Sequence, residues 1–367
     1  MIHLLAASSL IERFKEFSNF VCQPAPFLII NVAAFFVFLA GYRKLTEPRI
    51  AAPFGIALVF FFIASCFDPN FVKIVSKGDN VPIVMMIFAI GFFIWLAFRQ
   101  AAINDRNTEE GRPLTEAGSD DKVLVWPDLV YTELICLVLC TAFLTVWAIA
   151  LRAPLEQPAD PNVAPNPAKA PWYFLGLQEM LVYFDPWLAG VLLPGLIIVG
   201  LIAIPFIDKN PRGNGYYTFK ERKFAISTFL FGFLILWVVL IIFGTFLRGP
   251  NWNFFGPYEY WDPHRPAALL NTEFHDLFWI GLLGRPLPAN YLVRELPGFV
   301  LLGAYFAFGP AVLMVFLKKL YRQIGFLRYS VLSVLMLFML LMPIKMVLRW
   351  TLNLHYILGV TEWFFNV

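Results

Sequence analysis

Histidine and cysteine are the residues that most often bind metals and haem, and this chain has four of each. The histidines are His3, His264, His275 and His355, and none lies inside a long uncharged apolar run. A haem held between two membrane helices needs a histidine from each helix. This chain cannot supply that pair, and it has no C-x-x-C-H motif for covalent haem attachment.

Two of the four cysteines, Cys136 and Cys140, stand four residues apart and so share one face of a helix. They are either small packing residues of an apolar helix or a redox or metal-binding pair. The chain has no Walker loop, no dinucleotide-binding G-x-G-x-x-G motif after a strand and no H-E-x-x-H motif. If the protein does redox work, we therefore expect the metals to belong to a partner.

A few polar residues beside apolar segments are further candidates for chemistry. Glu133 lies at the start of an apolar run, where it is either a functional acid or a carboxylate that interacts with the helix dipole. His264 and His275 lie in a long aromatic segment and are either plain loop residues or contacts for a partner. Lys345 and Arg349 follow the last apolar run, and we expect their side chains to reach the membrane interface.

The segment 158–179 joins a proline-rich stretch to a run of aromatic residues. Prolines favour an extended path up to Pro171, and proline is also favourable in the first turn of a helix. We therefore expect a short surface helix to start near Trp172, with Glu179 about two turns further on. An aromatic-lined cleft with one or two polar groups suits an amphipathic quinone ring. The alternative interpretation is an aromatic belt that anchors a loop at the membrane surface.

The composition indicates whether such a segment belongs to a soluble protein or to a membrane protein. The 367 residues are 59% hydrophobic and 14% charged, and the mean hydropathy is +0.69. Soluble proteins have about 45–50% apolar and about 25% charged residues, so an ordinary soluble enzyme is excluded. The formal net charge of +3 gives no indication of a nucleic-acid partner.

Long runs without Asp, Glu, Lys or Arg identify the membrane spans, because a helix needs about 20 apolar residues to cross the hydrocarbon core. The eight runs are Cys22–Tyr42, Ile50–Phe67, Val81–Phe98, Leu134–Leu151, Trp187–Ile207, Phe224–Leu247, Leu296–Leu317 and Tyr329–Ile344. They are too long and too uniformly apolar for barrel strands. The sequence thus predicts an all-α, polytopic membrane protein with about eight transmembrane helices.

The distribution of lysine and arginine predicts the orientation of these spans. One set of connections, 43–49, 99–128, 208–223 and 318–328, holds 16 basic residues in 64 positions. The other segments hold 12 in 140 positions. The first set is therefore expected inside, which places both termini outside. The first 20 residues are too polar for a secretory signal, and they are either an interfacial amphipathic segment or a solvated lead-in.

The segment from Trp126 to Leu247 resembles the C-terminal half of cytochrome b, and especially subunit IV of the plastoquinol–plastocyanin oxidoreductase. The motifs that carry the resemblance are Trp126-Pro127-Asp128-Leu129, Pro158-Ala159-Asp160-Pro161, Lys169 to Leu175, and Leu192 to Asp208. Lys169 to Leu175 is similar to the family's Pro-Glu-Trp-Tyr segment, which lines its quinol-oxidation site. Gly213 to Lys223 and Gly249 to His264 look closer to variants in bacterial menaquinol-type complexes. The first three spans and the last two are not explained by the resemblance.

The resemblance implies a split cytochrome b C-terminal subunit of a quinol:cytochrome c reductase, in the respiratory chain of a bacterial cell membrane. Quinol, expected to be menaquinol, would be oxidised on the outer side, with proton release there. The implied quinol-binding residues are Pro171, Trp172, Tyr173, Phe174 and Leu175. The implied partners are membrane lipids, a subunit with the N-terminal half of cytochrome b that carries the b haems, a Rieske iron–sulfur protein and a c-type cytochrome. The alternative is a membrane anchor or a transporter-type subunit without a redox site.

The chain departs from the family at Pro171, which matches the family's glutamate within Pro-Glu-Trp-Tyr. That glutamate is thought to accept a quinol proton, and proline cannot. Our hypothesis is that Glu179 or Asp185 takes over this catalytic role, because a carboxylate beside quinol can accept a proton. The rival interpretation is a surface carboxylate with no role in proton transfer.

These interpretations divide the chain into five parts. They are a three-span extension at 1–98, a cytoplasmic acidic connection at 99–125, a cytochrome b-like core at 126–247, an outer aromatic loop at 248–295 and a two-span extension at 296–367.

Overall fold

The computed structural model describes residues 2–118, 122–150, 158–210, 215–266, 270–360, 363 and 365–367, with side chains from Ser9 onward. Parts of four predicted connections, at 119–121, 151–157, 211–214 and 267–269, lie outside the described residues. The chain divides into two compact units. Unit 1 contains Met1–Phe36, Asn166–Gly213 and Ser227–Val367, and unit 2 contains Val37–Pro165 and Asn214–Ile226.

Long apolar helices dominate the described part of the chain, and eight of them have the length and composition to cross a membrane. These spans are α2 (Pro24–Leu45), α3 (Pro48–Ser65), α5 (Val81–Glu109), Val125–Ala150, Leu188–Ile207, Lys223–Leu247, α13 (Leu296–Ile324) and α14 (Phe326–Leu352). The predicted all-α fold with eight spans is confirmed. Most side chains of these helices are exposed on the protein, as is typical of helices whose apolar surface faces lipid.

Several spans are built from consecutive helical segments with different hydrogen-bonding patterns. The span at 125–150 joins η2 (Val125–Leu129) to α6 (Val130–Ala150), and the next joins η3 (Leu188–Leu192) to α8 (Leu193–Ile207). The span at 223–247 contains α9 (Lys223–Leu230), η4 (Phe231–Val238), α10 (Val239–Ile242) and η5 (Phe243–Leu247). The segments η2 to η5 are π-helical, a geometry that often occurs at functional sites.

The remaining helices and strands precede, connect or follow the spans. They are α1 (Ile2–Val21), α4 (Pro69–Val75), η1 (Thr115–Gly118), α7 (Trp172–Met180), η6 (Pro250–Trp252), α11 (Phe274–Asp276), η7 (Leu277–Leu282), α12 (Tyr291–Arg294), β1 (Gly359–Val360) and β2 (Phe365–Asn366). The two strands pair antiparallel, with Gly359 opposite Asn366. Predicted helix α7 begins at Trp172, as the proline pattern indicates.

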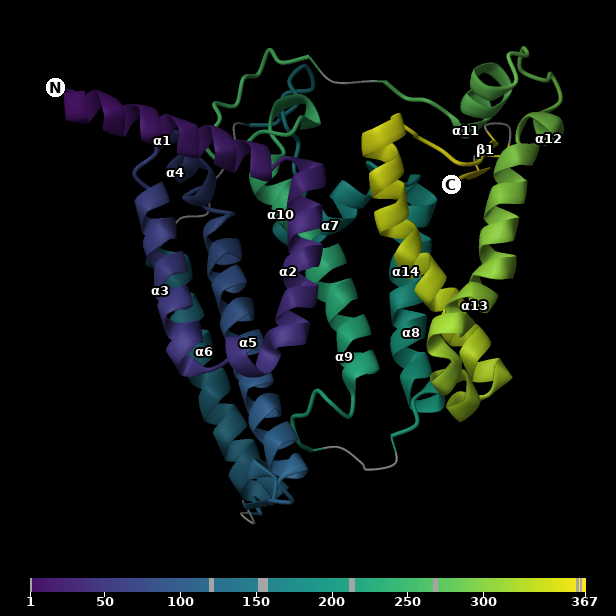
Figure 1. Ribbon diagram of the computed structural model, residues 1–367. Coiled ribbons are helices and arrows are strands. Elements are labelled where there is room, and N and C mark those ends of the chain that lie inside the picture. The colour runs from purple at the N-terminus through teal and green to yellow at the C-terminus, as the bar shows by residue number, and fades with distance from the viewer. Residues whose placement is uncertain are drawn as a thin grey trace. The chain divides into compact units, whose positions relative to one another are not determined.

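In unit 1, helices α13 and α14 pack along each other, and α14 also packs on α8 (Figure 1). Helix α7 packs on α10 and on η5. The first part of α2 joins this unit through aromatic contacts, with the Phe27 and Phe243 rings 5.4 Å apart. Helix α1 contacts the segment near Tyr258, whose backbone N–H donates to Asn19 Oδ1 at 3.0 Å. The core of this unit therefore lies where α7 packs on α10 and η5.

In unit 2, helix α5 continues to Glu109, eleven residues beyond the predicted end of its span at Phe98. The extra turns carry a buried carboxylate, Asp105, that is 3% exposed. It accepts hydrogen bonds from the Tyr42 hydroxyl at 2.7 Å, the Thr218 hydroxyl at 2.5 Å and the Lys220 backbone N–H at 3.0 Å. Helix α5 thus holds part of the connection between α8 and α9.

Candidate functional site

The site is built around α7, whose start is set by the residues before it. Pro171 has extended backbone angles and directly precedes Trp172. Gln178 closes the proline-rich segment onto the helix: its Oε1 accepts from the Ala170 backbone N–H at 2.8 Å, and its Nε2 donates to the Ala168 carbonyl at 2.8 Å. The approach to the helix is therefore fixed by a side chain of the helix itself.

The predicted quinol-binding residues fall on two faces of the chain at α7. Tyr173 and Phe174 are 52% and 51% exposed, Pro171 is exposed, and Trp172 is half-buried. Tyr173 lies between its two neighbours, with ring centroids 5.8 Å from Trp172 and 4.8 Å from Phe174. Leu175, by contrast, is buried. The structure thus presents three aromatic rings at the surface of α7 and uses Leu175 for packing.

Close packing beneath α7 depends on two glycines. A Cβ at Gly244 would lie 3.2 Å from the Leu175 carbonyl oxygen, and a Cβ at Gly176 would lie 3.4 Å from the Trp237 ring. The glycines therefore let α7 lie directly on the span formed by α9 to η5. This packing fixes the position from which the aromatic side chains project.

Glu179 is the most deeply buried acid of the site and forms an ion pair. Its side chain has 0% exposure, and its Oε1 and Oε2 accept from Arg248 Nη2 at 2.7 Å and Nε at 2.9 Å. The Tyr183 hydroxyl also donates to Oε1 at 3.2 Å. Burial, followed by the charge of Glu179, raises the pKa of Tyr183 well above its usual value, so the phenol remains a donor. Such two-point guanidinium–carboxylate contacts are strong and geometrically specific.

Asp185, the other predicted acid, is half-buried and has no cationic partner among the described residues. Its Oδ2 accepts from Asn366 Nδ2 at 2.9 Å and from the Tyr356 hydroxyl at 3.3 Å. Its Oδ1 lies 3.4 Å from the backbone N–H of Trp187, and the Trp187 indole donates to the Asn366 carbonyl at 3.1 Å. The C-terminal strand segment therefore holds this carboxylate from one side.

A second cluster of polar side chains contacts the backbone next to Tyr356. Glu273 Oε1 is 3.1 Å from His355 Nδ1, and Glu273 Oε2 accepts from the Tyr356 backbone N–H at 3.1 Å. Lys345 has 0% exposure and donates from Nζ to the His355 carbonyl at 2.6 Å. Lys345 therefore does not reach solvent, contrary to our expectation, because a backbone carbonyl beyond the end of α14 accepts its hydrogen bond.

The predicted loop residue His275 also has structural partners. Its Nδ1 is 2.8 Å from Glu295 Oε1, and Glu295 is 1% exposed. Glu295 Oε2 accepts from the Gly359 backbone N–H at 3.1 Å, so this carboxylate joins the start of α13 to β1. His264 is exposed, and its backbone N–H donates to Asp262 Oδ1 at 2.9 Å.

The remaining candidates are not drawn into this site. Glu133 is exposed in the first turn of α6, where a carboxylate interacts favourably with the helix dipole. Cys136 and Cys140 are exposed free thiols. Within the described ranges, no group of three or more His, Cys, Asp and Glu side chains is arranged to hold a metal ion.

Four residues of the site could not be singled out from the sequence: Arg248, Tyr183, Tyr356 and Asn366. Each was an ordinary loop or interface residue in the sequence pattern. Arg248 did carry a usable signal, because it is a lone arginine immediately after a 24-residue uncharged run. Tyr356 and Asn366 contact Asp185 over 171 and 181 residues of sequence, so no local pattern predicts them, whereas Tyr183 stands only four residues from its partner Glu179.

The comparisons with known proteins relate to the same part of the chain. Residues 158–256 match the family model described as cytochrome b(C-terminal)/b6/petD. A search of the solved structures found no match. The matched residues contain α7, Glu179, Asp185 and Arg248, together with the two spans Leu188–Ile207 and Lys223–Leu247. Residues 158–256 are therefore similar to the C-terminal domain of cytochrome b, within a chain that has eight candidate membrane spans.

Proposed function

We propose that this chain is the membrane subunit of a quinol:cytochrome c reductase that contributes the outer quinol-oxidation site. The observation that carries the proposal is the family match at 158–256, because it contains α7 with its exposed aromatic face. Aromatic rings with few polar groups suit an amphipathic quinone ring. In this proposal Trp172, Tyr173 and Phe174 contact the quinol ring, and Pro171 and Leu175 fix the position of that surface.

Of the two predicted acids, Asp185 is the better proton acceptor. Glu179 is fully buried, and both of its oxygens already accept hydrogen bonds from Arg248, so a proton added there would break a buried ion pair. Asp185 is half-buried, and its contacts come from neutral donors. Asn366 Oδ1 is also buried without a hydrogen-bond partner among the described residues. A hydroxyl of the substrate would satisfy this acceptor beside the Asp185 carboxylate.

Oxidation of quinol to quinone releases two protons and two electrons. In the proposed reaction, Asp185 accepts a proton from a quinol hydroxyl, and the half-buried position lets it pass that proton to outer water. Tyr356 and Asn366 hold the carboxylate in place, while Glu179 and Arg248 hold α7. The electrons leave to redox centres on partner subunits, which supply the iron–sulfur and haem chemistry.

The proposed partners are those that the resemblance to the family implies. The histidines present do not fit a haem between two spans, since none lies inside an apolar run and two of them contact carboxylates. We place the b haems on a cytochrome b N-terminal-half subunit, with a Rieske protein and a c-type cytochrome as further partners. We further propose menaquinol as the substrate and a bacterial cell membrane as the location.

The proton role is tested with charge-removing variants in the assembled complex. Asp185→Asn should lower the rate of cytochrome c reduction by a menaquinol analogue about 10²-fold or more, with unchanged haem content. The matched control is Asp160→Asn, which alters an exposed aspartate of the proline-rich segment and should keep the wild-type rate. Wild-type turnover in Asp185→Asn would refute the role of Asp185.

Membership of the reductase is tested separately. The tagged chain is purified gently from its native membrane, and a reduced-minus-oxidised spectrum is recorded. Copurifying b- and c-type haems are expected. A solitary, haem-free protein would contradict the proposal and favour a membrane anchor.

A further inference from the structure

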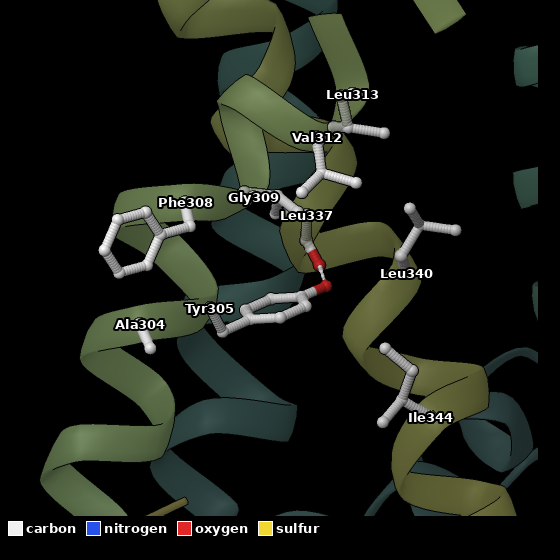
Figure 2. A pocket seen from close by; sticks show the side chains of 9 residues that line it. All are labelled: Ala304, Tyr305, Phe308, Gly309, Val312, Leu313, Leu337, Leu340 and Ile344. Atoms are coloured by element: carbon white, nitrogen blue, oxygen red, sulfur yellow. Dashed lines mark hydrogen bonds between the residues drawn. The ribbon is translucent and has the colours of Figure 1, made fainter. Parts of the chain in front are cut away.

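An apolar groove and a cluster of positive charges lie on the same pair of helices, α13 and α14, outside the segment that matches the family. The groove has a volume of about 330 Å³. Its walls are Ala304, Tyr305, Phe308, Gly309, Val312 and Leu313 of α13 with Leu337, Leu340 and Ile344 of α14. Figure 2 shows these side chains from both helices around one space. None of the proposed redox chemistry uses it.

The groove has no polar group available to a polar ligand. The Tyr305 hydroxyl, the one polar side-chain atom of the lining, donates to the Leu337 carbonyl at 2.7 Å (Figure 2). At Gly309 a Cβ would lie 2.7 Å from a methyl carbon of Leu337, so the glycine lets the two helices approach closely at the floor. An occupant must therefore be a hydrocarbon chain rather than a polar molecule.

The length of the groove matches one leaflet of a membrane. From Ala304 to Leu313 the helix rises about 14 Å, and half of the hydrocarbon core is about 15 Å. Leu313 marks the end nearest the turn between α13 and α14. Beyond it, α13 is kinked at Leu317, where the backbone angles are not helical, and the charged residues begin immediately after the kink.

The turn carries four exposed basic residues, Lys318, Lys319, Arg322 and Arg328. The sequence has no acidic residue from 296 to 361 that could pair with them. In the described part of unit 1, none of the four has a hydrogen bond or an ion pair to another side chain. Lys318 stands about 8 Å beyond Leu313 along the helix. Four positive charges at the predicted inner membrane surface, next to a groove long enough for an acyl chain, complement a lipid with a negative headgroup.

We propose that α13 and α14 form a binding site for an anionic phospholipid. One acyl chain lies in the groove, and Lys318, Lys319 and Arg322 contact the phosphate headgroup. The site needs both parts, because charge alone selects any anion and the groove alone accepts any lipid. This proposal is independent of the quinol site, since it rests on different residues and on lipid binding rather than turnover.

The headgroup is tested by competition. The protein, purified with its partners in neutral detergent, is mixed with phosphatidylglycerol and phosphatidylcholine of identical acyl chains, and retained lipid is measured by native mass spectrometry. Wild type should retain phosphatidylglycerol preferentially. The triple variant Lys318→Gln, Lys319→Gln and Arg322→Gln should lose about tenfold or more of that preference. The control Lys44→Gln, Arg49→Gln and Arg106→Gln removes three exposed charges elsewhere and should keep it.

The groove is tested with a matched pair of substitutions on one helix. Ala304→Trp fills the groove and should lower phosphatidylglycerol retention severalfold, whereas Ala307→Trp changes an exposed residue outside the lining and should not. Val312→Trp provides a second filling variant if Ala304→Trp does not fold. Inorganic phosphate should not displace the lipid. Equal retention of both lipids by wild type, equal behaviour of both tryptophan variants, or displacement by phosphate alone would overturn the proposal.

Discussion

At the scale of single residues, the Glu179–Arg248 pair shows how a carboxylate of the candidate site can serve the fold. Both side chains are almost completely buried, at 0% and 8% exposure. Removing one partner of such a pair costs about 3–5 kcal/mol, because the other charge stays buried and unpaired. Replacing both by apolar residues of similar size costs far less. The stability of α7 therefore depends on having both charges present, because either one alone would be buried without its partner.

We expect Arg248→Met to lower the yield of folded protein and its melting temperature in detergent. The double variant Glu179→Leu with Arg248→Met should recover part of that loss, since no buried charge is left behind. Both measurements use thermal unfolding of the purified complex. A double variant that is less stable than Arg248→Met would contradict the account of the pair.

Tyr356 links the stability of unit 1 to pH. Burial, with the charge of Asp185 as the next contribution, raises the pKa of Tyr356 to about 12. The folded state therefore favours the protonated phenol. Its contribution to stability is complete below the pKa of a free tyrosine, about 10, and is lost as the pH rises through 12.

This sign gives a measurable difference between wild type and Tyr356→Phe. In an absorbance titration of tyrosinate, subtracting the variant from the wild type should leave one group that titrates near pH 12 and none near pH 10. The stability of the variant should also fall less steeply than that of wild type as the pH rises from 10 to 12. A difference titration centred at pH 10 would show that the Tyr356 hydroxyl does not interact with Asp185 as described.

At the scale of elements, the start of α13 is shaped to receive the C-terminal segment. A Cβ at Gly298 would collide with the Ile357 carbonyl oxygen, which is backbone and cannot easily move. Gly298→Ala should therefore displace the segment that brings Tyr356 and Asn366 to Asp185. Gly303→Ala on the same helix is the control, because its Cβ would meet no atom within 4 Å.

The expected cost of Gly298→Ala is about 1–3 kcal/mol, typical of overpacking, and it should appear as faster proteolysis after residue 352. Gly303→Ala should behave like wild type in the same digestion. If both variants are cut at the wild-type rate, the contact between Gly298 and Ile357 does not position the C-terminal segment.

A second element-scale contact belongs to unit 2, where Asp105 of α5 holds residues 218–220. Asp105→Ala would leave the Tyr42 hydroxyl and two backbone N–H groups without their acceptor. Each unsatisfied buried donor costs about 1–3 kcal/mol. We expect faster proteolytic cleavage near residue 220 in this variant. Asp79→Ala, which changes an aspartate with 60% exposure, should not alter the cleavage.

Sequence patterns were sufficient for the elements but not for their contacts. Hydropathy predicted all eight spans, because lipid forces every long apolar run into a helix, but four of the helices extend seven to eleven residues beyond the uncharged runs. Proline chemistry gave the start of α7. The partners of Asp185 could not be predicted, because Asn366 is 181 residues away and is positioned by the C-terminal strand pair. The extension of α5 was missed since its last turns are polar and pack on a loop.

At the scale of the whole molecule, unit 1 contains most of residues 158–256, which match the family model, together with parts of the chain that lie outside the match. Helix α1, α13, α14 and the C-terminal residues all belong to this unit. The C-terminal residues supply Tyr356 and Asn366 to Asp185, and the α13–α14 pair carries the proposed lipid site. The extension therefore completes the candidate site instead of only anchoring it.

Contacts within unit 1 also bear on the direction of the chain through the membrane. Helix α1 contacts Tyr258, and the C-terminal segment contacts Asp185 and Thr272, so both ends of the chain lie with the loops at 166–187 and 248–295. In Figure 1 these segments lie at one end of the unit and the α13–α14 turn at the other. The distribution of basic residues predicts that the first end faces outside.

Single cysteines in a background without Cys22, Cys66, Cys136 and Cys140 test this orientation. Asp262→Cys lies in the outer loop and Gln323→Cys near the α13–α14 turn, and both positions are exposed. A membrane-impermeant maleimide should label Asp262→Cys in intact cells and Gln323→Cys only after permeabilisation. The reverse pattern would place Asp185 and α7 on the inner side, where protons released from quinol could not contribute to an outward gradient. The proposed lipid site would then face the outer leaflet, so one labelling experiment decides the side of both sites.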